Sequence, residues 1–122
     1  MHNDLEIWLS KADLNGEERK KIINETLRQV KKDFALQGIE LETDSLNIEE
    51  LVYSFSSLLD QLEFLHNPKL PSLLYQLDLK EAEISHKLTT SKPELTYKVL
   101  SESILKRCFE KVMWRRKFQS RK

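Results

Sequence analysis

The sequence has few of the residues that break or cross-link a chain: two glycines, three prolines and a single cysteine, Cys108, among 122 residues. One cysteine cannot form a disulfide within the chain, and it excludes zinc sites built from several cysteines. Two glycines are too few for the glycine-rich loops that bind phosphates. Sandwiches and barrels need turn residues about every 8–12 positions, so the scarcity of glycine and proline also disfavours all-β folds.

Long apolar runs are also missing. The longest stretch without a charged residue, Leu51–Leu59, has nine residues, whereas a helix that crosses a bilayer needs about 20. The N-terminus is acidic where a secretory signal carries a basic region. A lone thiol suits a reducing compartment. We therefore expect a cytoplasmic protein without a membrane span.

The residues that are abundant favour helices. Leucine occurs 21 times and isoleucine seven times, against four valines, and leucine is the better helix former. Five times, a polar residue is followed three positions later by glutamate, the pattern of a helix-capping box. These pairs are Asn3–Glu6, Asn15–Glu18, Asn47–Glu50, Asp78–Glu81 and Ser91–Glu94. The chain is thus predicted to start helices along its whole length.

Apolar spacing predicts three main helices, over residues 16–36, 48–66 and 92–119, with shorter ones over 4–12 and 79–88. The predicted buried stripes are Ile23, Leu27, Val30 and Phe34; then Leu51, Phe55, Leu58, Leu62 and Leu65; then Ile104, Leu105, Cys108, Phe109 and Val112. Residues 72–77 are predicted as a turn or two of helix, and 39–43 as an extended connector. The expected fold is all-α: one domain over 1–122, a bundle of four to six mainly antiparallel helices with a long C-terminal helix. Residues 117–122 are either its last turn or a disordered basic tail.

Charge is distributed unevenly along a chain whose net charge is zero. Residues 106–122 hold eight bases and one acid, so the first 105 residues carry a net charge of −7. Residues 33–68 contain no lysine or arginine and eight acids, which are Asp33, Glu40, Glu42, Asp44, Glu49, Glu50, Asp60 and Glu63. This separation of charge predicts that each region contacts a surface of opposite charge, either in the same protein or in a partner.

The basic region supplies the candidate binding residues: Arg107, Lys111, Trp114, Arg115, Arg116 and Lys117. A helical projection places Arg107, Lys111, Lys117, Arg121 and Lys122 opposite the apolar stripe. Arg116 falls on the stripe itself, so either the packed part ends there or Arg116 meets an acid across the contact. These bases are predicted to pair with acids of the same chain or of a second copy, or to bind nucleic-acid phosphates, with Trp114 stacking beside them. An anionic membrane surface and an acidic protein partner are the other ligands that a basic helix of this kind suits.

Catalytic signatures are weak. Glu63/His66 and Glu83/His86 have the spacing of di-iron ligands, but such a site needs bridging glutamates from two further helices, so it would require completion by a second subunit. Cys108 lies on the apolar arc, where a thiol behaves as a small hydrophobe. We therefore predict no enzyme, no metal and no cofactor.

The sequence predicts a small non-catalytic protein-interaction module that acts through its acidic 33–68 and basic 106–122 surfaces, alone or as a homodimer. The alternative is a nucleic-acid-associated protein that binds phosphates through the basic C-terminal helix.

Overall fold

The computed structural model describes residues 16–41 and 51–119. Within these ranges the chain is all-α, with no strand. The helices are α2 (Gly16–Ala35), α3 (Leu51–Gln61), α4 (Leu70–Gln76), α5 (Glu81–Thr90) and α6 (Thr96–Gln119), with 3-10 turns η2 (Phe64–His66) and η3 (Pro93–Leu95). The predicted all-α class and the long C-terminal helix are therefore confirmed. None of the described helices is long and apolar enough to cross a bilayer.

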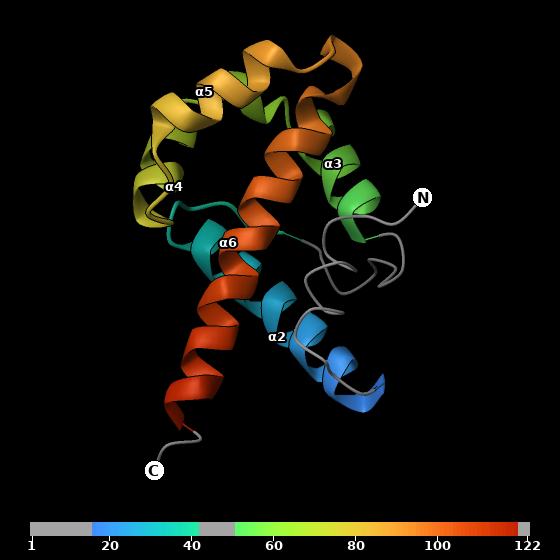
Figure 1. Ribbon diagram of the computed structural model, residues 1–122. Helices are drawn as coiled ribbons and strands as arrows, with labels where there is room; N and C mark the ends of the chain where they lie inside the picture. Colours follow the sequence, from blue (N-terminus) through green and yellow to red (C-terminus); the bar gives the residue numbers. More distant parts are fainter. Residues whose placement is uncertain (1–15, 42–50, 120–122) are drawn as a thin grey trace.

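Helix α6 runs through the length of the molecule and contacts most of the other elements (Figure 1). Its C-terminal half lies against α2 and its N-terminal half against α3. The α2–α6 pair is antiparallel, because Glu25 of α2 meets Arg116 while Asp33 meets Lys111. Helix α5 lies at the end of the molecule where α6 begins, and α4 lies beside the C-terminal end of α2 (Figure 1).

The core is centred on three phenylalanines from three elements. The ring of Phe34 in α2 stacks on Phe64 of η2 at 5.3 Å between centroids, and it meets Phe55 of α3 edge-on at 5.8 Å. The predicted stripe of α6 is buried as expected, from Ile104 to Val112. Burial of these apolar side chains is the main source of stability in such a domain.

Two helices end in Schellman motifs. After α2, Gly38 adopts a left-handed φ of 76°, Ile39 N–H donates to Phe34 and Gly38 N–H to Ala35. After α4, Asp78 occupies the equivalent position with φ 60°. Glycine takes this conformation without steric cost, whereas aspartate tolerates it less well.

The predicted helix over 48–66 is wrong at its C-terminal end. Helix α3 stops at Gln61, because Glu63 takes a left-handed φ of 48°. The turn buries Phe64 against Phe34 and leaves Leu62 exposed, so Leu62 does not continue the predicted leucine stripe.

Two of the predicted capping boxes are also wrong. Asp78 ends α4 instead of starting α5, which begins after Lys80, and Ser91 ends α5 and donates its hydroxyl to Leu88. The boxes at Asn3, Asn15 and Asn47 and the helix predicted over 4–12 lie outside the described residues. Residues 120–122 of the predicted tail lie there too.

Candidate functional site at the α2–α6 interface

Helix α2 presents a second buried stripe, beside the predicted one, toward α6. Its members are Ile22, Thr26, Gln29 and Asp33, all at most 9% exposed. The spacing i, i+4, i+7, i+11 places them on one face. Three of its four members, Thr26, Gln29 and Asp33, are polar, so hydrophobic periodicity could not reveal the stripe.

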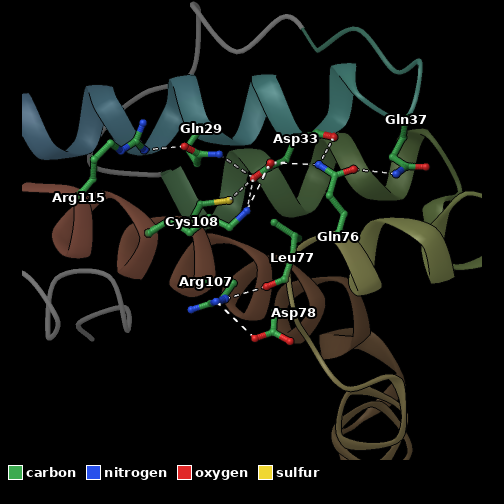
Figure 2. A network of polar contacts seen from close by, with 10 residues as sticks. Gln29, Asp33, Gln37, Gln76, Leu77, Asp78, Arg107, Cys108 and Arg115 are labelled. Carbon is green, nitrogen blue, oxygen red and sulfur yellow. Dashed lines mark hydrogen bonds and ion pairs between the residues drawn. The ribbon is translucent and has the colours of Figure 1, made fainter. Parts of the chain in front are cut away.

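Asp33 is the centre of a buried polar network (Figure 2). Its carboxylate accepts hydrogen bonds from Nε2 of Gln29 and Nε2 of Gln76, both at 3.1 Å, and pairs with Nζ of Lys111 at 3.3 Å. Gln76 also donates to the backbone oxygen of Asp33 and accepts from Gln37. A buried carboxylate needs this degree of compensation, because an unpaired one would be strongly destabilising.

Cys108 joins the same network. Its thiol lies 3.6 Å from Oδ2 of Asp33 and is buried. Burial, and then the neighbouring Asp33 carboxylate, raise the pKa of the Cys108 thiol far above its usual range, although Lys111 acts in the opposite direction. The protonated thiol is a poor nucleophile, since thiolate is the reactive form.

Four of the six candidate binding residues contact acceptors in the same chain, namely Arg107, Lys111, Arg115 and Arg116. Arg107 donates through Nε to the backbone oxygen of Leu77 at 2.7 Å and lies 3.7 Å from Asp78. Lys111 pairs with Asp33. The projection placed Arg107 and Lys111 opposite the apolar stripe, but this side of α6 is covered as well, by Asp33 of α2 and by Leu77 and Asp78 after α4.

Arg116 resolves the two alternatives that its position on the stripe left open. Its guanidinium bonds both oxygens of Glu25, at 3.1 and 3.2 Å, and reaches Glu18 at 3.4 Å. Arg116 thus meets acids across the α2–α6 contact. Pairing within the chain accounts for these bases, but Glu18, Glu25 and Asp78 lie outside the predicted acidic region.

The acidic region contributes less than predicted to this pairing. Among its members that the structure describes, Asp33 alone pairs with α6, and Glu40, Asp60 and Glu63 are exposed. Glu42, Asp44, Glu49 and Glu50 lie outside the described residues, as do Arg121 and Lys122 of the basic region.

Trp114, Arg115 and Lys117 are exposed on the C-terminal part of α6. Trp114 is 69% exposed and borders a groove of about 620 Å³ between α6 and the first half of α2. Ile22, Phe109 and Met113 line its apolar part, and Glu18, Glu110, Arg116 and Lys117 also line it. We call this feature the Trp114 groove. An exposed tryptophan beside an apolar groove is a common anchor for a protein partner.

A second hollow, of about 280 Å³, also lies between α2 and α6 and is polar. It is lined by Glu25, Arg28, Gln29 and Lys32 of α2 with Arg115 and Arg116 of α6. We call it the basic hollow. Sequence reasoning missed Arg28 and Lys32, although their i, i+4 spacing on α2 was the available signal.

The two Glu-x-x-His patterns do not form a di-iron arrangement. The left-handed turn at Glu63 interrupts the helix, so Glu63 and His66 lack the i, i+3 geometry, while Glu83 and His86 are exposed on α5. Within 16–41 and 51–119, no three potential metal ligands of the His, Cys, Asp or Glu type cluster together.

No protein-family model matches this chain, and no curated protein or solved structure shows detectable similarity to it.

Proposed function

We propose that this protein is a non-catalytic interaction module whose Trp114 groove binds an acidic segment of another protein. The observation that carries the proposal is Trp114 itself, a large side chain left 69% exposed beside apolar groove residues. Its indole would bury a large apolar surface on binding, and tryptophan is enriched among residues that dominate binding energy.

The charge around the groove indicates the kind of partner. Helices α2 and α6 together hold thirteen bases and six acids, a net charge of +7. The rest of the chain therefore carries −7. An acidic partner is attracted to this helix pair over a longer range than the groove itself acts.

The same charge argues against a symmetric homodimer through this face. A two-fold interface places the same patch on both sides, so it would set one positive helix pair against another. A head-to-tail contact could instead seat Trp114 on the groove of about 730 Å³ between α3 and η3, which Asp60 and Glu94 line. Repetition of such a head-to-tail contact builds a ring or an open chain of copies.

The binding experiment uses the full chain with Trp8→Phe, which leaves Trp114 as the single tryptophan. Peptides are selected from a random displayed library and titrated while Trp114 emission is recorded. We expect acidic peptides with apolar residues at helical spacing, and a blue shift as the indole leaves water. Trp114→Ala should weaken the binding of these peptides by about 2 kcal/mol or more, which is roughly thirtyfold in Kd.

The matched control is Tyr75→Ala, since Tyr75 is 88% exposed on α4, away from the groove. It should leave peptide affinity unchanged. Unchanged binding by Trp114→Ala, or selected peptides without acidic residues, would contradict the proposal. Light scattering on the same sample tests self-association, because mass that rises steadily with concentration would indicate head-to-tail chains.

Nucleic-acid binding is the second candidate, favoured by the exposed Arg28, Lys32 and Arg115 in the basic hollow. Fluorescence anisotropy of a labelled single-stranded RNA distinguishes it. Binding must then weaken steeply with added salt, with a slope set by the number of phosphates neutralised. RNA binding without any peptide binding would replace the first proposal by this one.

A further inference from the structure

The basic hollow has more positive charge than its own acid neutralises. Of the six residues that line it, four are bases and one, Glu25, is an acid. Both oxygens of Glu25 already accept from Arg116. Arg28, Lys32 and Arg115 therefore add three further positive charges around one concave surface.

Two of these three bases have side chains without an intramolecular partner. Within the residues that the structure describes, the Arg28 guanidinium and the Lys32 ammonium make no hydrogen bond or ion pair, and both are exposed. Like charges held close together on a helix face repel each other, and a bound anion would relieve that repulsion.

The third base, Arg115, is held in place by a hydrogen bond to a buried side chain. Nη2 of Arg115 donates to Oε1 of Gln29 at 2.6 Å, and Gln29 is only 8% exposed. Nε2 of Gln29 in turn donates to Asp33, so the amide can present only its oxygen to Arg115. The buried Asp33 network thus orients Gln29, and Gln29 positions the Arg115 guanidinium at the hollow (Figure 2).

The size of the hollow suits a compact anion. Its volume of about 280 Å³ corresponds to roughly nine water molecules at about 30 Å³ each. That is enough for one tetrahedral anion with part of its hydration shell. Arginine offers paired N–H donors that match phosphate oxygens, and lysine adds a point charge.

The geometry points to a binding site for a single phosphate dianion, held by Arg28, Lys32 and Arg115 between α2 and α6. The ligand class is inorganic phosphate or the phosphate group of a phosphomonoester. This site shares Arg116 with the Trp114 groove but none of its three binding residues, so the proposal does not depend on a protein partner at that groove.

The test titrates the full chain with inorganic phosphate and with phosphoserine at constant ionic strength, followed by two-dimensional NMR. We expect saturable shifts at residues 28–32 and at the Arg115 side chain, with millimolar affinity because the site is open to water. Tighter binding of phosphoserine would identify the ligand as a phosphomonoester, and tighter binding of phosphate would identify it as the free ion. The absence of saturation with both would overturn the proposal.

The variant Arg28→Gln/Lys32→Gln should weaken binding by about tenfold or more, since each lost charged hydrogen bond is substantial. The control Lys20→Gln/Lys21→Gln removes the same charge from exposed positions of α2 outside the hollow. An equal loss of phosphate affinity in both variants would show only general attraction to a positive surface, which contradicts a specific site.

All four substituted positions are exposed, so equal thermal unfolding of the two variants is the check on folding. A single-stranded RNA is also tested as a competitor for bound phosphate. If Arg28→Gln/Lys32→Gln abolishes RNA binding and Lys20→Gln/Lys21→Gln does not, the hollow is assigned to nucleic-acid phosphates instead.

Discussion

The two halves of α6 are held by different physical interactions. The N-terminal half buries Leu100, Ile104 and Leu105, and the Ser101 hydroxyl donates to the backbone oxygen of Val52 in α3 at 3.2 Å. The C-terminal half also buries Phe109 and Val112, but it adds the polar network of Asp33 and the Arg116 pairs with Glu18 and Glu25. Apolar burial is non-directional, whereas hydrogen bonds and ion pairs require a fixed geometry.

This difference explains why the candidate sites lie on the C-terminal half. A shift of α6 along α2 would leave the Asp33 carboxylate without Lys111, so the network fixes the register of the two helices. With the register fixed, Arg115 and Trp114 occupy defined positions although they are exposed. The apolar half contributes stability and the polar half determines which groups reach the surface.

Among these variants, we expect Asp33→Ala to have the largest effect on the C-terminal half of α6. It removes the shared acceptor of Gln29, Gln76 and Lys111. Removing one partner of a buried ion pair typically costs about 3–5 kcal/mol. We expect a loss of that size in the free energy of unfolding, measured by urea denaturation.

Adding Lys111→Met to Asp33→Ala should restore part of the loss, because it removes the partly buried cation that has lost its carboxylate partner. If the double variant is less stable than Asp33→Ala, or if Asp33→Ala costs under about 1 kcal/mol, the network is not the main contact between α2 and α6.

The matching test of the apolar half is Leu100→Ala. Leu100 is fully buried, and such a truncation costs about 2–5 kcal/mol through lost burial and the cavity left behind. The loss should be the same at low and high salt, since no charge is involved. The control is Leu95→Ala, where the side chain is 40% exposed and the cost should be much smaller. A strongly salt-dependent loss for Leu100→Ala would contradict the division of α6 into two halves.

The smallest expected effect is that of Arg116→Gln. Its pairs with Glu18 and Glu25 are partly exposed, and ion pairs of this kind contribute about 0.2–1 kcal/mol. Urea denaturation should show a loss in this range at low salt that shrinks as salt screens the charges. A loss as large as that of Asp33→Ala would mean that the outer ion pairs, and not the buried network, hold the C-terminal half.

The sequence by itself predicted α2 and the buried arc of α6 well, because these elements have regular apolar spacing. It failed at the end of α3, where Leu62 and Leu65 continue the spacing but a left-handed turn at Glu63 buries Phe64 instead. The competing contact, Phe64 on Phe34, joins residues 30 positions apart in the chain. Local periodicity contains no information about such a contact.

For the candidate sites, the sequence determined the supply of charge and only the tertiary structure decided its use. The sequence has eight bases in its last 17 residues, but it did not indicate which of them would form ion pairs with acids of α2. Arg107, Lys111 and Arg116 are paired, while the bases of the hollow come from two helices far apart in the sequence. The physical reason is that a helical projection describes the faces of a single helix. A site formed between two helices depends on the angle and register at which they pack.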